Sequence, residues 1–373
     1  MKGRVLITGG AGFLGSHLAD RLLRDGWQVR LFDALLHQVH GGRPPAYLDP
    51  EAELVVGDVR DPAALRRALE GVDTVVHFAA AVGVGQSMYE IAHYASTNVV
   101  GTAHLLELIV RDRLPLRRLL VASSMSAYGE GRYVCACGTL DPVPRALAQL
   151  QRGEWELRCE RCRQGARPVA TPESKPLLPQ SVYAVTKRDQ EELVLSVARA
   201  SRLSALALRF FNIYGSRQAL SNPYTGVGAI VASALLNGRR PMIFEDGLQQ
   251  RDFVHVDDVV QACRLAIEHV EVEGLALNVG SGTPVRLLDL VAALQAVIPG
   301  AEDLAPEVLG RFREGDIRSC FADISLARRL LGYEPRVTLA EGARTLASWA
   351  GQQAGEFRSP QALDELRRHG LVV

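Results

Sequence analysis

The chain has 373 residues, of which 47% are hydrophobic, and its 42 Lys and Arg residues balance 42 Asp and Glu residues. This length can bury a large core divided into two or more domains. The zero net charge does not indicate a basic surface for a nucleic acid, and no apolar stretch approaches the length that spans a membrane. We expect a cytoplasmic protein without a signal peptide, because the first residues already form a strand pattern.

The first motif is a glycine-rich turn between a strand and a helix. Residues 4–8 form a short β-branched run, Gly9, Gly12 and Gly15 follow it, and leucines at helical spacing come next. Glycines let the backbone approach a pyrophosphate, which the helix N-terminus then binds. A second strand pattern ends about 20 residues further on at Asp33, whose carboxylate would bind the adenosine ribose and repel a 2′-phosphate. The motif predicts NAD in preference to NADP, with a capping role for Asp33 as the alternative.

Strand patterns alternate with helical segments along the rest of the chain, near residues 54–56, 74–78, 118–122, 205–209 and 275–279. This alternation predicts an α/β fold with a doubly wound parallel sheet of the Rossmann type. Ligands of such sheets bind at the carboxyl ends of the strands, so the residues that follow each strand are candidate cofactor contacts. The residues that follow strands are Asp58, Val59, Phe78, Ala79 and Ala80, and the first turn of the first helix adds Phe13 and Leu14. Asn98 would be an indirect contact of the cofactor or a solvated helix residue.

Tyr183 and Lys187 lie four residues apart at the start of a helical pattern at about 182–200. One helical turn therefore places a phenol and an ammonium on the same face. The pKa of tyrosine is about 10, so a tyrosine base near pH 7 needs its phenolate stabilised by roughly 4 kcal/mol. A neighbouring cation supplies that stabilisation directly. The alternative is an incidental pair on a surface helix.

Together these motifs resemble the extended short-chain dehydrogenase/reductase family of NAD-dependent nucleotide-sugar epimerases and dehydratases. The resemblance covers about residues 3–350, apart from one insertion. The segments that carry it are 8–15, Asp33, Asp58 with Val59, Ser124, Tyr183 with Lys187, 209–215, 251–258 and 313–318.

The resemblance also implies how the chain is divided. An NAD-binding domain would span residues 1–209 and include 252–280, and a smaller C-terminal α/β substrate lobe would comprise 210–251 and 281–373. A cysteine-rich insertion would span 133–166. Helices near 92–112 and 182–200 would build a homodimer.

The resemblance assigns the catalytic roles. Tyr183 would be the general base and acid, Lys187 would lower its pKa and bind the nicotinamide ribose of tightly bound NAD, and Ser124 would hold the reacting hydroxyl. Dehydratases of this family carry acids where this chain has Met125 and Ser126. We therefore predict a 4-epimerase that oxidises C4 to a ketone and returns hydride to the other face. A 4-ketoreductase that consumes NADH or NADPH and a non-catalytic NAD-binding scaffold are the alternatives.

The resemblance places the substrate contacts in the C-terminal lobe and in two loops. The positions that meet the diphosphate and ribose of a nucleotide sugar are Asn212, Arg251, Arg313 and Asp316. Loops 81–90 and 218–226 resemble a branch that includes dTDP-L-rhamnose 4-epimerases, which predicts a dTDP-6-deoxyhexose. Their candidate sugar contacts, with one residue beside Ser124, are Gly83, Gln86, Ser87, Tyr224 and Ser126. A UDP-hexose or UDP-uronate is the alternative, and the base, the sugar stereochemistry and the reaction direction stay open.

The insertion separates Ser124 from Tyr183 by more than twice the spacing that the resemblance implies. Its four cysteines are Cys135, Cys137, Cys159 and Cys162. Two cysteine pairs on two turns predict a zinc ribbon, in which four thiolates hold one structural Zn²⁺.

A segment this short needs a metal to fold, and a site with four protein ligands has no position for a substrate. Two disulfides are disfavoured in a reducing compartment, and redox chemistry or inert thiols are the remaining alternatives. The insertion is rich in arginine, which suits a solvated surface or a lid over a diphosphate as well as it suits a nucleic acid. Cys263 and Cys320 are isolated and are read as small apolar residues.

Overall fold

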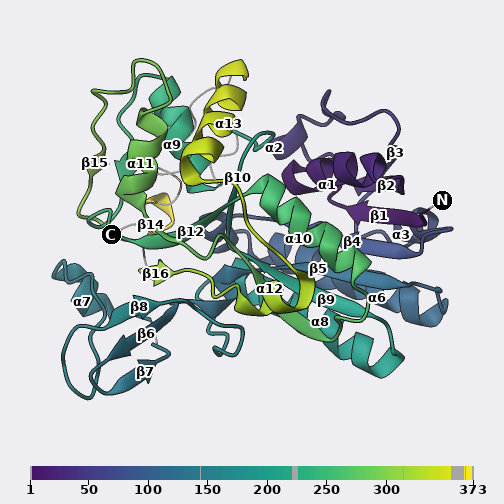
Figure 1. Cartoon of the computed structure of the whole chain (residues 1–373), viewed down its shortest axis with the longest axis horizontal. Helices are drawn as coiled ribbons and strands as arrows, with labels where there is room; N and C mark the ends of the chain where they lie inside the picture. The colour runs from purple at the N-terminus through teal and green to yellow at the C-terminus, as the bar shows by residue number, and fades with distance from the viewer. Residues whose placement is uncertain are drawn as a thin grey trace.

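The computed structural model describes residues 2–142, 144–220, 226–313, 315–353, 365 and 367–371. Its central sheet contains β1 (Arg4–Thr8), β2 (Gln28–Asp33), β3 (Glu53–Val56), β4 (Thr74–His77), β5 (Arg118–Ser124), β9 (Ala205–Phe210) and β13 (Leu275–Val279). The strand order is β13-β9-β5-β4-β1-β2-β3, and every neighbouring pair is parallel (Figure 1). The predicted doubly wound parallel sheet is confirmed.

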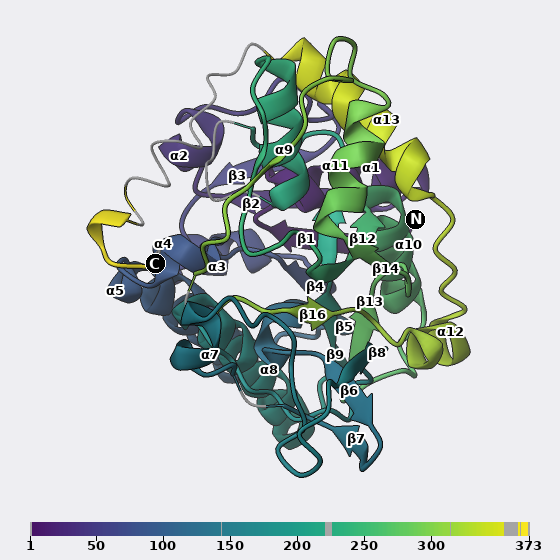
Figure 2. The same ribbon diagram turned by 90° about the vertical axis from the view of Figure 1, so that its left-hand side faces the viewer.

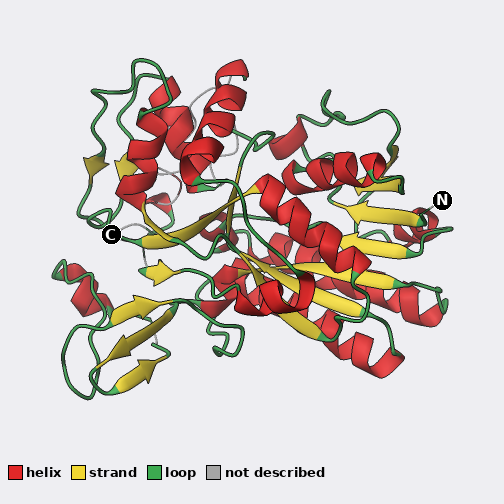
Figure 3. Ribbon diagram, in the orientation of Figure 1, coloured by secondary structure: helices red, strands yellow, loops and turns green. Residues whose placement is uncertain are grey.

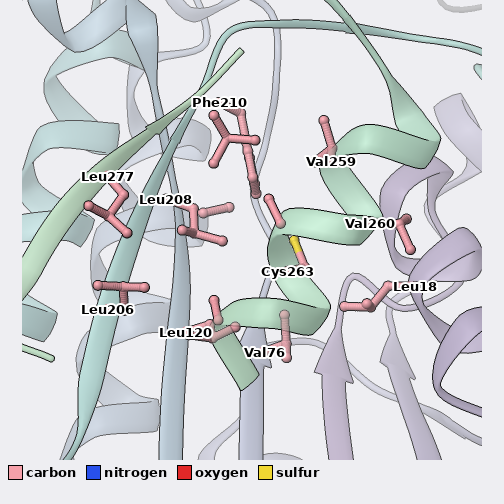
Figure 4. Close-up of a cluster of buried hydrophobic side chains, with 14 of the residues drawn as sticks. Leu18, Val76, Leu120, Leu206, Leu208, Phe210, Val259, Val260, Cys263 and Leu277 are labelled. Atoms are coloured by element: carbon pink, nitrogen blue, oxygen red, sulfur yellow. The ribbon is translucent and has the colours of Figure 1, made fainter. Parts of the chain in front are cut away.

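Helices cover both faces of this sheet, as Figure 3 shows. One face carries α3 (Pro62–Leu69), α6 (Gly101–Arg111) and α8 (Val182–Ser201), and the other carries α1 (Phe13–Arg24), α10 (Val256–Glu268) and α12 (Ser325–Leu331). The apolar stripe of each helix packs on the β-branched and leucine side chains of the strands. Cys263 lies among apolar side chains of α10 and the sheet (Figure 4), which fits its reading as a small apolar residue.

Polar residues explain where two of these helices, α3 and α8, begin. The Asp61 carboxylate caps α3 by accepting hydrogen bonds from the first free amides, and Pro62 follows at the first helical position. The Ser181 hydroxyl caps α8 in the same way by accepting from Ala184 N. Because α8 begins at this cap, Tyr183 stands in its first turn and Lys187 in its second.

A smaller lobe follows the sixth strand of the central sheet. It contains β10 (Asn212–Tyr214), β11 (Met242–Ile243), β12 (Gln250–His255), β14 (Pro284–Arg286), β15 (Glu307–Val308), β16 (Ser319–Cys320), α9 (Val227–Leu236), α11 (Leu287–Gln295) and α13 (Leu339–Gln352). The three helices bury a separate core with residues of β10, β11, β12 and β14, which belong to smaller sheets of this lobe. Two later segments, β13 and α12, return to the central sheet, so the chain crosses between the two cores more than once.

The insertion forms its own small sheet, which lies at the lower edge of the molecule in Figures 1 and 2. Strand β6 (Arg132–Cys135) pairs antiparallel with β7 (Gly138–Leu140) and β8 (Arg167–Val169), and the short helix α7 (Leu147–Gln151) lies between β7 and β8 in the chain. We call residues 132–169 the insertion from here on. Among the described residues, no helix is both long and apolar enough to cross a bilayer.

Candidate active site

The glycine turn after β1 is built for close approach of the backbone. Gly9 has φ of 67°, in the left-handed region that favours glycine, and Gly12 caps α1. A side chain at Gly15 would place its Cβ only 2.4 Å from the Gly9 carbonyl oxygen, so α1 packs directly on the turn. Phe13 and Leu14 form the first turn of this helix. This is the geometry by which a helix N-terminus receives a pyrophosphate.

Asp33 ends β2 beside the same turn. Its carboxylate accepts a hydrogen bond from Ala11 N at 3.0 Å and another from Leu35 N at 2.9 Å. The acid is therefore fixed next to the glycine turn, where a cofactor ribose is expected. Asp58, after β3, is held by Arg60 at 2.6 Å, and this hydrogen bond keeps the pKa of Asp58 below its usual value. Val59 is buried behind it in the apolar core.

The loop after β4 is held by backbone contacts and one buried amide. Phe78 N and Ala79 N donate to the carbonyl and hydroxyl of Thr8, and Ala80 follows them at the strand end. The Asn98 side chain, which is fully buried, accepts from Ala81 N at 2.7 Å and donates to Ala81 O at 3.1 Å. Asn98 therefore positions this loop through protein contacts, which places it behind the cofactor site.

Ser124 and Tyr183 meet at the carboxyl end of β5. The hydroxyl and the backbone N–H of Ser126, in the turn η2 (Met125–Tyr128), both donate to Ser124 Oγ, at 2.9 and 3.2 Å. Since Ser124 accepts these two bonds, its own proton is directed elsewhere, and it bonds the Tyr183 phenol. Burial raises the pKa of Tyr183 to about 12, and the Ser124 hydrogen bond lowers it in part. The two residues after Ser124 carry no carboxylate.

Lys187 lies behind this pair and is almost fully buried. Its ammonium donates to Ala122 O at 2.8 Å and to Gln190 Oε1 at 2.9 Å. Burial lowers the pKa of Lys187 to about 7. Two of its three donors thus have protein partners, which leaves one for a cofactor hydroxyl.

Lys187 is the end of a buried hydrogen-bond chain that reaches back to β1. Gln190 Nε2 donates to Thr102 Oγ1 at 2.9 Å, and Thr102 Oγ1 lies 2.9 Å from His77 Nε2. His77 Nδ1 lies 2.7 Å from the Thr8 hydroxyl, which already accepts from the loop after β4. The pattern assigns the histidine proton to Nε2, and burial with nearby Lys187 lowers the His77 pKa to about 3.

A second buried network fixes the turn that carries Ser124. Arg209 forms a two-pronged ion pair with Glu191 of α8, at 2.5 and 3.0 Å, and donates to the Tyr128 hydroxyl at 2.7 Å. Tyr128 in turn donates to Asn278 Oδ1 at 2.8 Å. The end of η2 is therefore tied to α8, the helix of Tyr183. The sequence did not single out Gln190, Thr102, Glu191 or Asn278.

The predicted diphosphate contacts differ in how they are used. Asn212 Oδ1 is buried, and among the described residues it has no hydrogen-bond partner, which marks it as a candidate ligand contact. The Arg251 guanidinium donates to three backbone carbonyls, among them Arg318 O at 3.1 Å, and so joins β12 to the residues just before β16. Arg313 and Asp316 pair with each other at 2.9 Å.

The predicted sugar loop uses much of its polarity on itself. Gly83 caps the short helix α4 (Val84–Ser87), and the buried Ser87 hydroxyl donates to Val84 O at 2.6 Å. Gln86 bonds Glu90 and accepts from Tyr94 at 3.3 Å, and the Tyr94 ring meets that of Tyr183 edge-on, with centroids 6.5 Å apart. The loop therefore reaches the catalytic tyrosine through Tyr94. Tyr224 lies outside the described residues.

The four cysteines of the insertion converge, and all six cysteines of the chain are free. The sulfur atoms of Cys135, Cys137, Cys159 and Cys162 lie within 4.8 Å of one another. Four thiolates around a tetrahedral Zn²⁺ at about 2.3 Å would lie roughly 3.8 Å apart. Cys137 N also donates to Cys135 Sγ at 3.2 Å. This donor set and its spacing fit a four-coordinate soft metal ion after a small contraction.

The sequence model of the NAD dependent epimerase/dehydratase family matches residues 5–145 and 163–280. The stretch between the matches, 146–162, lies in the insertion and holds two of its cysteines. The chain is 34% identical to dTDP-L-rhamnose 4-epimerase from Burkholderia thailandensis, over 94% of this chain and 95% of that protein.

Two solved structures have the same fold over nearly their whole length. UDP-glucose 4-epimerase from Thermotoga maritima, with UDP-glucose, matches with a TM-score of 0.76 and 30% identity, over 93% of this chain and 98% of its own. UDP-glucuronic acid 4-epimerase from Bacillus cereus, with UDP-glucuronic acid and NAD, also has a TM-score of 0.76, at 25% identity, over 94% of this chain and 99% of its own.

Proposed function

The chain belongs to the NAD dependent epimerase/dehydratase family and is a nucleotide-sugar 4-epimerase, and from that premise we propose that it acts on a dTDP-6-deoxyhexose. The carrying observation is the contact of Ser124 with Tyr183 at the end of β5, with Met125 and Ser126 in place of acids. A hydroxyl, a phenol and an ammonium suffice for the proton transfers of a reversible alcohol oxidation in which NAD would accept the hydride, whereas loss of water needs further acid and base groups.

The residues at the glycine turn fit NAD. Gly9 and Gly15 let the turn and α1 pack closely, which brings the N-terminus of α1 to the place where a pyrophosphate would lie, and Asp33 stands fixed beside the turn for a ribose. NAD, when bound, supplies the hydride acceptor and later the hydride donor. Asn98, Phe78 and their neighbours shape the wall behind it.

The protein side of the reaction is a proton transfer in both directions. Tyr183 takes the proton of the C4 hydroxyl as the hydride leaves C4, and Ser124 holds the reacting oxygen. Lys187 stabilises the phenolate, which is needed because burial alone raises the pKa of Tyr183. After the 4-keto sugar has turned, Tyr183 returns the proton as hydride returns to the other face. No net oxidation occurs, so no reductant is consumed.

The deoxyhexose rests on the similarity to the Burkholderia thailandensis enzyme, while the structural relatives act on UDP sugars. In the described part of the sugar loop, Gln86 and Ser87 already bond protein groups, so few of their donors remain for a polar group at C6 of the sugar. This favours a 6-deoxy sugar over a uronate, whose carboxylate would need charged donors. UDP-hexose and UDP-uronate are the alternatives.

The reaction type has a direct test. We expect dTDP-L-rhamnose to reach an equilibrium mixture with its C4 epimer without added NADH or NADPH, because the hydride removed is the hydride returned. Proton NMR of the sugar, with dTDP-glucose, UDP-glucose and UDP-glucuronate in parallel, identifies both substrate and product. Product that forms only with stoichiometric NADH or NADPH would make the enzyme a 4-ketoreductase.

We further propose that the four cysteines of the insertion bind one structural Zn²⁺. Its ligands would be Cys135, Cys137, Cys159 and Cys162. The apolar core of the insertion is small, with Tyr133, Leu157 and Ala166 buried and Leu140 packed against them. Such a core cannot hold a lobe of this size by hydrophobic burial, so a metal supplies the missing cross-link. The proposed ion is structural, because all four positions are thiolates.

Metal content checks this proposal. We expect about one zinc per chain by elemental analysis of protein purified without chelators, and loss of that zinc in a Cys159→Ser variant. A matched change at Cys263, which is buried in the central core, should leave the zinc content unchanged. Protein without bound metal that also fails to take up added zinc would contradict the site.

A homodimer is the assembly that we propose. Helices α6 and α8 bury one face against the sheet and leave Val110 and Val185 exposed on the other side, with Val100 just before α6. Exposed apolar residues on two adjacent helices suit a helical interface between two copies.

A further inference from the structure

The insertion is joined to the substrate lobe by a cluster of charged residues that we call the docking cluster. It consists of Glu130, Arg145, Glu156, Glu245, Asp246 and Arg318. Four of them, Glu130, Arg145, Glu245 and Arg318, have side chains only 1% exposed. Two buried arginines thus face two buried glutamates, and removal of Arg145 takes the paired cation away from the buried Glu130.

The docking cluster also grips the backbone of the segment that follows Arg313. Arg145 donates to Asp316 O at 2.9 Å, and Glu130 accepts from Arg318 N at 2.7 Å and from Ser319 N at 3.2 Å. Three backbone groups of residues 316–319 are therefore fixed by two side chains. Arg145 belongs to the insertion, and Glu130 lies two residues before it. This segment also lies beside the start of the catalytic helix, because a Cβ on Gly315 would come 3.0 Å from Gln180 O.

The cysteine turn and the docking cluster are two ends of one short stretch of chain. Glu156, three residues before Cys159, pairs with Arg318, and the carbonyl of Trp155 accepts from Arg145 at 3.2 Å. The Trp155 ring also lies 6.3 Å from that of Phe312. On the other side, Tyr133, two residues before Cys135, donates to Glu130 at 3.2 Å.

We propose that the metal-bound insertion is a brace for nucleotide binding: its cysteine site fixes residues 154–159, and the docking cluster transmits that order to the segment of Arg313 and Asp316. This inference rests on the proposed function, in which that segment meets the diphosphate and ribose. Without the metal, the stretch keeps the small core around Leu157 and the two hydrogen bonds that Gln149 donates to its backbone. The contacts that it offers to Arg145 and Arg318, through Trp155 O and Glu156, are then held less firmly. The metal site therefore regulates affinity for the nucleotide sugar and leaves the proton transfer at Tyr183 unchanged.

Arg145 is the positioning residue to test, with Arg152 as its matched control. Both are arginines of the insertion, but the Arg152 side chain is 59% exposed, and within the described part of the chain its ion pair is with Glu154, two residues away. We expect Arg145→Met to weaken binding of dTDP and UDP, measured by titration calorimetry, and to raise KM at least tenfold, while kcat stays within threefold. Arg152→Met should match the wild type. Arg145→Lys, which restores the charge without the fork, should recover part of the affinity.

Zinc removal supplies the second arm. Stripping zinc from the wild type should weaken dTDP and UDP binding to a similar degree, and added zinc should restore it. Removal of zinc from the Arg145→Met variant should weaken its nucleotide affinity by less than a further threefold, because the contact between the insertion and residues 316–319 is already lost. If Arg145→Met does not fold, Glu156→Gln, at a side chain 61% exposed, should show a smaller loss in the same direction.

Two results would overturn the brace: nucleotide affinity that is unchanged on zinc removal, or a kcat that falls as far as the affinity does. Zinc-loaded wild type that binds neither dTDP nor UDP would instead overturn the proposed function itself, and the brace with it. The two failures are therefore distinguished by the zinc-loaded wild type alone.

Discussion

Replacing Tyr183 by phenylalanine should lower kcat by about 10²- to 10⁴-fold, the range for loss of a positioned general acid–base group. The Tyr183 phenol is the group that Ser124 contacts. In the described contacts, the other side-chain oxygen beside Ser124 Oγ is the Ser126 hydroxyl, which stays neutral near pH 7. The ring itself stays, with its edge-on contact to Tyr94, so the helix and the cofactor wall should be preserved. Affinity for dTDP and retention of NAD should therefore change by less than threefold.

The same chemical change at another buried tyrosine is the control for Tyr183→Phe. Tyr333 donates to Gly280 O at 2.8 Å, away from the triad, so Tyr333→Phe should cost one hydrogen bond, about 1 kcal/mol of stability, and little activity. Rates come from the sugar NMR assay, and NAD from its absorbance in denatured protein. If kcat of the Tyr183→Phe variant lies within tenfold of the wild-type value, the proton transfer must be assigned to another group.

The fold was predictable because its signals are local. β-branched runs, glycine turns and helical leucines define the strands and helices of a parallel sheet, and the rule for strand ends then places Asp33 and Ser124 at one edge. The return of α12 to the central sheet was not predictable in this way. Its apolar residues have the same spacing as those of any amphipathic helix, and only tertiary packing selects the core that they join.

The catalytic helix carried one signal that the sequence reading left unused. Tyr183, Lys187 and Gln190 stand at i, i+4 and i+7, and Thr186 shares their side of the helix. A helix that packs on a sheet should be apolar on that face, so a row of polar residues there indicates a buried network. The partners Thr102 and His77 come from other elements, and sequence spacing cannot show that they meet.

The insertion shows the same limit more sharply. Arg145 counts among its basic residues and suggests a solvated surface, yet its side chain is 1% exposed between Glu130 and Glu245. Charge composition cannot distinguish a surface arginine from a buried one, because the burial depends on Glu245, which lies 100 residues away in sequence. Likewise Arg251, expected on a diphosphate, donates to backbone carbonyls of the segment that the docking cluster holds. Long-range pairing decides both cases.

Replacing Lys187 by methionine should lower kcat by about 10²- to 10³-fold, since a cation about 4 Å from an anion is worth roughly 4 kcal/mol at an effective dielectric constant near 20. Burial lowers the pKa of Lys187 from 10.5 to about 7, so the ammonium is present below that pH and is lost above it. Wild-type kcat/KM should therefore fall on the basic side, and this decline should be absent in Lys187→Met.

The sign of the stability effect separates this decline from unfolding. Between pH 7 and 10.5 the unfolded chain would bind more protons at Lys187 than the folded chain, so this residue alone makes the fold more stable as the pH rises. Lys175, which is also buried and donates to Tyr128 O at 3.1 Å, is the matched control, and Lys175→Met should lose stability but keep the basic decline. Rate profiles from pH 5.5 to about 9.5 decide the matter. A basic decline with an unchanged midpoint in Lys187→Met would assign it to another group, and Lys187 would then serve to bind the cofactor and not to tune Tyr183.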